Sequence, residues 1–282
     1  MIEQAIYELI VRTATDLPDD VMAALANARE KATPGGAECS VLETMLKNAD
    51  VAKAKRQPVC QDTGTLLFYI KAPVGINTME FEEAATAAVV RATKEGILRQ
   101  NCVETLTGHN TGTNVGYGSP VFHWSFSERN DMEITLMLKG GGSENMGIQY
   151  SLPDSSLNAG RDLNGVRKCI LDAVNRAQGM GCAPGILGVA IGGDRATSYE
   201  ESKKQLLRHI GERSNEPELA ELEASILEEA NSLGIGPMGL GGKTTLLDLF
   251  IGWRCRLPAS YFVSVSYMCW CCRRHTITLP CK

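Results

Sequence analysis

Hydrophobic and polar positions follow two different periods along this chain. Apolar residues recur at helical spacing in the longer segments, and shorter apolar runs typical of strands separate them. The helical spacing predicts helices over residues 2–12, 19–31, 40–54, 77–96, 162–179, 198–210 and 217–233. The shorter runs predict strands over residues 66–74, 120–126, 132–138, 186–193, 245–251 and 260–268.

These elements predict an α+β fold in a single domain over residues 1–282. The first three helices would form an N-terminal helical layer, and the strands would form a mixed β-sheet with the later helices packed on it. Ser40, Asn77 and Thr197 each precede a glutamate three residues later, which is the capping-box spacing of a helix start. Residues 101–118 predict a long loop, and loops of this length are usually functional or disordered.

Composition and charge exclude several classes of protein. The chain has 282 residues and a formal net charge of -5, with dispersed lysines and arginines, so we expect no nucleic-acid partner. No basic segment followed by an apolar one opens the chain, and no apolar run approaches the ~18–20 residues of a membrane span. We therefore expect a cytoplasmic protein whose ten cysteines are not a disulfide framework. Four of these cysteines are interpreted as buried apolar side chains: Cys39, Cys102, Cys169 and Cys255.

Two glycine-rich stretches are similar to nucleotide-binding motifs, but they lack the flanking strand and helix that such motifs require. GIGPMG at 234–239 follows a predicted helix, whereas a dinucleotide fingerprint follows a strand. GLGGKTT at 239–245 lacks the first glycine of a phosphate loop and precedes a predicted strand, so no helix N-terminus would face a phosphate. Tight turns are favoured, and a nucleotide-binding protein stays as an alternative.

The C-terminal segment contains a possible zinc-ligand set. Cys269, Cys272, His275 and Cys281 follow the spacing C-x2-C-x2-H-x5-C, and thiolates and imidazole suit zinc. A non-enzymatic, zinc-stabilised partner subunit is therefore a second alternative.

Three other thiols share one local setting. Cys60, Cys182 and Cys269 each lie where an apolar strand begins or ends, so their side chains could point into one cavity. Three thiolates could hold a [4Fe–4S] cluster and leave one iron open to oxygen ligands of a substrate. The residues alone do not separate this from three cysteines in the core.

Five motifs in order resemble one family. They are CQDTG at 60–64, KGGGSEN at 139–145, GCAPGILGVAIGG at 181–193, GIGPMGLGG at 234–242 and VSVSYMCW at 263–270. Together they look like the α-subunit family of class I, iron–sulfur fumarate hydratases and L(+)-tartrate dehydratases. The resemblance implies a [4Fe–4S] cofactor with Cys60, Cys182 and Cys269 as its ligands.

The resemblance also implies substrate contacts. Gln61 and Asp62 would face the substrate, with Asp62 catalytic in accepting or relaying a proton. Arg99 would bind a substrate carboxylate with its planar guanidinium, and Gly141 would present its backbone. The alternative for Asp62 is an Asx turn with Gly64, and both roles can coexist. Ser143 and Asn145 are weaker candidates, and His109 and His123 are more readily explained as structural.

The resemblance further implies a partner. Family members obtain the base that removes a proton next to a carboxylate, and further arginines, from a β subunit or from a second half of a longer chain. We therefore expect this α chain to bind a β subunit, as a heterotetramer, and to be inactive alone. The reaction would be hydration of fumarate to malate, with tartrate dehydration as the alternative. Cys271, Cys272 and Cys281 depart from the family pattern and have no assigned role.

Overall fold

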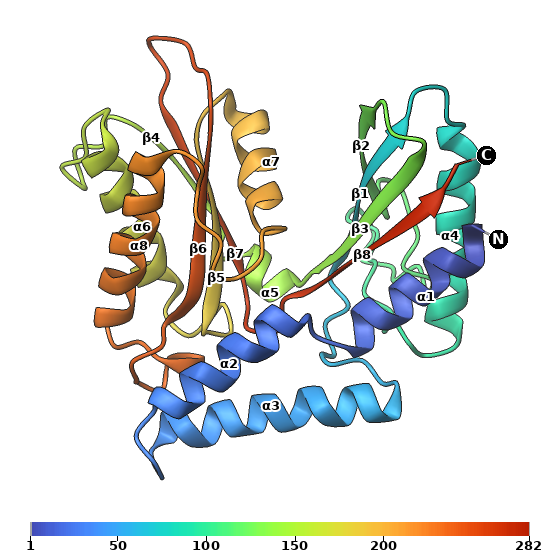
Figure 1. Cartoon of the computed structure of the whole chain (residues 1–282), viewed down its shortest axis with the longest axis horizontal. Helices are drawn as coiled ribbons and strands as arrows, with labels where there is room; N and C mark the ends of the chain where they lie inside the picture. Colours follow the sequence, from blue (N-terminus) through green and yellow to red (C-terminus); the bar gives the residue numbers. More distant parts are fainter. Residues whose placement is uncertain (1, 282) are drawn as a thin grey trace. The chain divides into compact units, whose positions relative to one another are not determined.

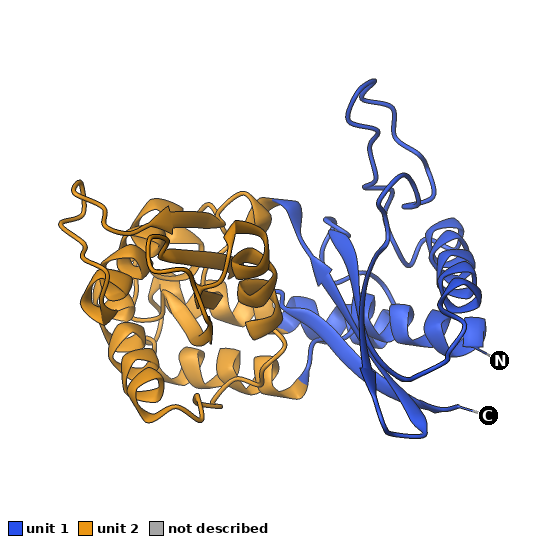
Figure 2. Cartoon of the chain, turned by 90° about the horizontal axis from the view of Figure 1, so that it is seen from above, with its two compact units in different colours: residues 1–18, 47–141, 271–282 blue, residues 19–46, 142–270 orange. Residues whose placement is uncertain are grey.

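A computed structural model of the chain describes residues 2–281. It confirms the α+β class, and the chain divides into two compact units, each with its own four-stranded mixed sheet (Figures 1 and 2). The first unit comprises Met1–Pro18, Lys47–Gly141 and Cys271–Lys282, and the second comprises Asp19–Leu46 and Gly142–Trp270. That residues 1–282 act as one catalytic domain stays a prediction.

The first unit has two helices against one face of its sheet. The strand order is β2-β1-β3-β8, with β1 parallel to β2 and β3 antiparallel to both β1 and β8. Strand alternation places Phe68 and Ile134 on the helical face, where they are fully buried with Ile10 and Val89. The elements are α1 (Ile2–Thr15), β1 (Thr65–Pro73), α4 (Thr78–Lys94), β2 (Val121–Ser127), β3 (Asp131–Lys139) and β8 (Arg273–Pro280).

The second unit has helices on both faces of its sheet (Figure 1). The strand order is β4-β7-β5-β6, with β5 parallel to β6 and β7 antiparallel to both β4 and β5. The elements are α2 (Asp19–Lys31), β4 (Ile148–Ser151), α6 (Leu163–Ala177), β5 (Gly185–Gly192), α7 (Arg195–Gln205), α8 (Pro217–Ser232), η1 (Pro237–Gly239), β6 (Leu246–Arg254) and β7 (Phe262–Met268). Two helices cross from one unit to the other in sequence: α3 (Ala37–Lys55) and α5 (Gly141–Glu144).

Side-chain alternation on β7 explains the two faces of this sheet. Val263, Val265 and Tyr267 lie in the apolar core formed with α6 and α8. The intervening Ser264 and Ser266 face α7, where their hydroxyls hydrogen-bond those of two serines on that helix at 2.7 Å. This period of two places Tyr267 on the apolar face, directly before the segment that carries Cys269.

Two predicted helix caps are wrong, and a third is confirmed. Asn77 caps α4 as predicted, since its side chain accepts from the backbone N–H of Glu80. Ser40 lies inside α3, and its hydroxyl donates back to the carbonyl of Gly36. Asp194, not Thr197, caps α7, with Thr197 as the third residue of the capping box. The chain enters both helices about three residues earlier than predicted.

Four elements were not predicted, and one of them is η1, which has 3 residues. The helix α5 has 4 residues, too few for a periodic signal, and β4 also has 4. Strand β8 has the sequence RRHTITLP, which lacks an apolar run, and it forms because it pairs along β3. No helix within residues 2–281 combines the length and apolar character that a membrane span requires.

Candidate active-site loops

Asp62 connects three segments of the first unit. Its Oδ1 accepts hydrogen bonds from the amide of Gly64 at 2.9 Å and from Nδ2 of Asn101 at 2.9 Å. Its Oδ2 accepts from the amide of Gly141 at 2.7 Å, and its backbone carbonyl accepts from Nη2 of Arg273 at 2.7 Å. The bond to Gly64 is the predicted Asx turn, which is confirmed. The catalytic role of Asp62 stays a prediction.

Gly64 lets the Asp62 loop approach the end of β3. Its φ is +76°, a left-handed conformation that glycine adopts without a steric penalty. A Cβ at this position would lie 2.5 Å from the backbone carbonyl of Lys139. The glycine of CQDTG therefore allows the contact between Asp62 and Gly141, since any side chain would push the two segments apart.

Arg99 is tied to the same loop through its backbone. Its carbonyl accepts a hydrogen bond from Oγ1 of Thr63 at 2.7 Å and another from Nδ2 of Asn114 at 2.7 Å. Thr63 and Asn114 are each only 2% exposed, so these anchors lie in the interior. The side chain of Arg99 is exposed, as is that of Gln61. The structure thus ties the backbone of Arg99 to the loop that carries Gln61 and Asp62, and it shows Gly141 bonded to Asp62.

The Cys60 thiol lies beside three groups that favour its ionised form. The pKa of Cys60 is lowered to about 6, chiefly by a hydrogen bond with the Cys271 side chain and against the opposing effect of burial. The amide of Asp62, 3.4 Å from Sγ, and the positive charge of Arg273 make smaller contributions to this lowering. A thiolate at neutral pH is the form that binds metals and reacts with electrophiles.

Cys182 and Cys269 are neighbours within the second unit. The antiparallel register of β5 and β7 sets Ile186 opposite Met268, so the segment entering β5 lies beside the segment leaving β7. The amide of Trp270 donates to the carbonyl of Cys182 at 3.2 Å and joins these two segments directly. Cys182 has a φ of 57°, which is uncommon for a residue other than glycine.

The GIGPMG motif supports the Cys182 loop. The amide of Met238 donates to the carbonyl of Ala183 at 2.8 Å. A Cβ on Gly179 would lie 2.4 Å from the carbonyl oxygen of Met238, so the two glycine-rich segments pack backbone to backbone. This packing explains the motif without a nucleotide.

GLGGKTT also has an internal partner. The amides of Lys243 and Thr244 both donate to Oε1 of Glu38, each at 2.9 Å. Glu38 is 7% exposed, so the backbone N–H groups that a phosphate would need already bind a buried carboxylate of the chain. The predicted strand, β6, follows the motif. These observations weigh against a nucleotide-binding protein.

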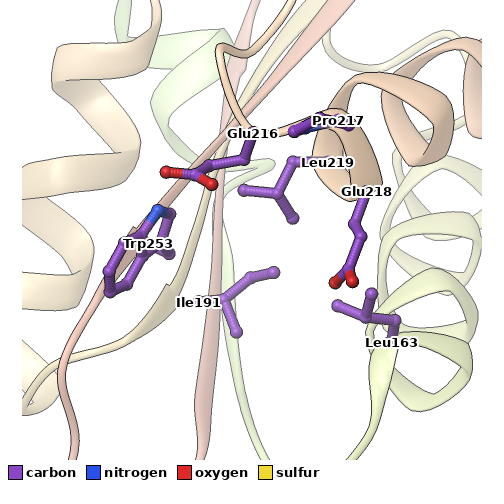
Figure 3. Close-up of a pocket in the computed structure, with 7 residues that line it drawn as sticks. All are labelled: Leu163, Ile191, Glu216, Pro217, Glu218, Leu219 and Trp253. Atoms are coloured by element: carbon purple, nitrogen blue, oxygen red, sulfur yellow. The ribbon is translucent and has the colours of Figure 1, made fainter.

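A pocket of about 500 Å³ lies elsewhere in the second unit and contains none of the predicted site residues (Figure 3). Its walls are mainly apolar, and its two carboxylates, of Glu216 and Glu218, would repel a dicarboxylate anion. Trp253 forms one side of it. The remaining lining residues are Leu163, Ile191, Pro217 and Leu219.

Comparison with known proteins identifies the family. The sequence model of the family described as fumarate hydratase (fumerase) matches residues 3–278, almost the whole chain. The chain belongs to the fumarate hydratase family. This agrees with the resemblance drawn from the five motifs, and it places CQDTG and the Cys182 and Cys269 segments within the matched region.

Members of this family differ in length around the shared region. A protein of Geobacillus stearothermophilus named as a class I fumarate hydratase is 48% identical over 274 residues, which are 96% of this chain and 53% of that protein. A protein of Methanocaldococcus jannaschii named as an L(+)-tartrate dehydratase subunit alpha is 38% identical, over 97% of this chain and 95% of its own. The L(+)-tartrate dehydratase subunit alpha of Escherichia coli K12 is 33% identical, over 94% of this chain and 86% of that subunit. The chain thus spans about half of the first relative and most of the other two.

The predicted metal ligands fall in both units. Cys60 belongs to the first unit, and Cys182 and Cys269 belong to the second. Within residues 2–281, no group of three or more His, Cys, Asp or Glu side chains is arranged to hold a metal ion. The assignment of these three thiols to one centre therefore stays a proposal.

The alternative zinc set does not fit the strand that contains it. His275 lies in β8, and Cys281 follows the end of this strand. Six residues of extended chain span ~20 Å, so these two side chains cannot bind one ion while the strand is intact.

Two residues of the first-unit site, Asn101 and Arg273, could not be identified from the sequence. Asn101 had only the polar composition of its loop as a signal, and Arg273, which is 1% exposed, lies in a segment without a strand pattern. Of the histidines, His123 stacks on Tyr69 with ring centroids 4.6 Å apart, and His109 is exposed. Cys39 and Cys169 are buried as predicted, Cys102 is half-buried, and the prediction for Cys255 is wrong because it is exposed.

Proposed function

We propose that this chain is the α subunit of a hydro-lyase that reversibly hydrates fumarate to malate. The observation that carries the proposal is Asp62, a family-motif carboxylate tied to Gly141 and Asn101 beside Arg99. Membership of the fumarate hydratase family and the relative named as a class I fumarate hydratase support the reaction.

L(+)-tartrate dehydration is the second candidate. It is favoured by the two relatives named as tartrate dehydratase α subunits, because this chain covers 95% and 86% of their lengths. The words 'subunit alpha' in these names support a β-subunit partner, and we propose that the two chains form a heterotetramer. The Geobacillus relative extends well beyond the shared region. We propose that this partner supplies the base for the carbon-bound proton and further carboxylate-binding groups.

The cofactor that we propose is a [4Fe–4S] cluster held by Cys60, Cys182 and Cys269. The donor chemistry of the chain fits it, since Cys60 ionises near neutral pH and the other two cysteines lie on adjoining segments. When bound, a cluster with three cysteine ligands supplies one iron with Lewis acidity for substrate oxygen atoms.

The side chains of the first unit would bind and orient the dicarboxylate. The exposed guanidinium of Arg99 can accept one carboxylate in a bidentate geometry, and the Gln61 amide can donate to a carboxylate oxygen. Asp62 can accept a proton from the hydroxyl that is added or removed, while the amides around it hold its carboxylate in one orientation. Gly141 has no side chain to cover this carboxylate, since a Cβ there would lie 3.7 Å from Oδ2.

Co-expression with a β subunit tests the proposal. The complex would be purified without oxygen, loaded with iron and sulfide, and assayed in parallel for fumarate hydration and L-tartrate dehydration. We expect cluster-dependent turnover of fumarate by the complex and none by the α chain alone. Turnover of tartrate alone would replace fumarate as the substrate, and failure of the complex to bind iron and sulfide would refute the proposed function.

A further inference from the structure

Tyr267 has a buried hydroxyl that the mechanism above does not use. The side chain is 2% exposed, and within residues 2–281 its Oη has no hydrogen-bond partner. Buried tyrosine hydroxyls are normally paired, because removing a hydroxyl from water without a partner costs free energy. Another core tyrosine of the same cluster follows this rule, since the Tyr150 hydroxyl donates to Asp172 at 2.7 Å.

The Tyr267 ring lies against the loop that carries Cys182. A Cβ on Gly181 would lie 2.5 Å from Cε1 of the ring, and a Cβ on Gly185 would lie 2.4 Å from Oη. The ring therefore contacts the backbone on both sides of Cys182, and glycines at these two positions make room for it. Tyr267 also lies two residues before Cys269 on the same chain segment.

The Tyr267 hydroxyl is thus a buried donor packed against the loop that carries Cys182, and no acceptor within residues 2–281 receives its proton.

We propose that the Tyr267 hydroxyl donates a hydrogen bond to a sulfur atom of the cluster bound at Cys182 and Cys269, and so positions the cluster and raises its reduction potential. The inference rests on the proposed function, because it requires the cluster. Hydrogen bonds to cluster sulfurs stabilise the reduced, more negative state, which is how a donor raises the potential. Tyr267 is a positioning residue in this proposal, because it would act through the cluster.

The test compares Tyr267→Phe with Tyr150→Phe in the reconstituted complex. Both changes remove one hydroxyl from the same apolar cluster and keep the ring, but only Tyr150 has a partner in the chain. Iron and sulfide content, the reduction potential and the EPR spectrum of the reduced cluster would be measured for each. We expect equal cluster loading, a more negative potential and an altered EPR spectrum for Tyr267→Phe, and wild-type values for Tyr150→Phe.

The outcomes separate this inference from the proposed function. A Tyr267→Phe complex with the wild-type potential and spectrum would overturn the inference and leave the function standing. A wild-type complex that binds no iron and sulfide would refute the function, and the inference with it. If the variant does not fold, wild-type protein with ring-deuterated tyrosine provides the readout. Deuterium coupling to the reduced cluster in pulsed EPR supports a tyrosine ring placed beside the cluster, as the hydrogen bond requires, and its absence overturns the inference.

Discussion

The amide of Gly141 donates a 2.7 Å hydrogen bond to Oδ2 of Asp62, across 79 positions of sequence. This bond joins the KGGGSEN segment to the CQDTG segment and holds the carboxylate from one side, while Asn101 holds it from the other at 2.9 Å. Two motifs that are far apart in the sequence therefore form one hydrogen-bonded site in the first unit.

Asp62→Asn should abolish most of the activity with little loss of structure. Asparagine has the same shape as aspartate, but an NH2 group replaces one carboxylate oxygen. This NH2 group would face an N–H donor that now binds the oxygen, and the side-chain amide cannot accept a proton. We expect kcat to fall by about 10²-fold or more, the scale of general acid–base catalysis. The control is Asp154→Asn, an Asx-turn residue of the second unit, where Oδ1 accepts from the amide of Ser156. Equal kcat for the two variants would contradict a catalytic role for Asp62.

Arg99→Lys should raise KM for the dicarboxylate more than it lowers kcat. Lysine keeps the positive charge but loses the planar fork that binds a carboxylate with two hydrogen bonds. We expect kcat/KM to fall roughly 10- to 100-fold, from the loss of about 1.5–3 kcal/mol of charged hydrogen bonding. Arg129→Lys changes an exposed arginine paired with Asp131 and should leave both constants unchanged. Wild-type KM in Arg99→Lys would show that Arg99 does not contact substrate.

Serine replacement of Cys60, Cys182 or Cys269 should each reduce bound iron and sulfide and remove activity. The matched control is Cys169→Ser, at a fully buried position on α6 in the apolar core. It should lower the free energy of unfolding by on the order of 1–3 kcal/mol, because it buries a hydroxyl in apolar surroundings, and leave cluster content intact. Colorimetric iron and sulfide analysis with thermal unfolding makes the comparison. Full iron and sulfide in any one of the three replacements would exclude that cysteine as a ligand.

Alkylation of Cys60 in cluster-free protein should follow a titration near pH 6. The pKa of Cys60 is lowered from 9.0, so the reactive thiolate is present above about pH 6 and is lost as pH falls below it. Cys271→Ala removes the largest cause of this shift and should move the midpoint toward higher pH. Burial raises the pKa of Cys169 to about 12, so Cys169 should stay unmodified at neutral pH. Peptide mass spectrometry after timed iodoacetamide treatment measures each rate, and a Cys60 midpoint unchanged by Cys271→Ala would contradict the assigned cause.

Gly179→Ala should destabilise the loop that carries Cys182. The new Cβ would lie 2.4 Å from the carbonyl oxygen of Met238, and backbone atoms cannot move away as a flexible side chain can. We expect a loss of about 1–3 kcal/mol in the free energy of unfolding, with weaker cluster retention. Gly142→Ala is the control, since nothing lies within 4 Å of its Cβ position. Denaturant unfolding of both variants decides the point, and equal stability would refute close packing of the two glycine segments.

The sequence by itself determined the local features of this protein. The helical period predicted α1, α2 and α8 nearly to their ends, and Asn77 was identified as a cap because its partner lies three residues away. The Asx turn of Asp62 with Gly64 could be predicted for the same reason. Each of these features depends on interactions between residues close in the chain, whose chemistry is visible in the order of side chains.

Tertiary structure alone decided which distant groups meet. Arg273 reaches the carbonyl of Asp62 across 211 positions, and it could do so only because β8 pairs with β3. Cys182 adjoins Cys269 because β5 and β7 pair in a register that no local pattern specifies. Many pairings are possible between distant strands, and the free energy of each depends on the whole packed core. The contacts between these distant residues therefore form only when the chain has folded.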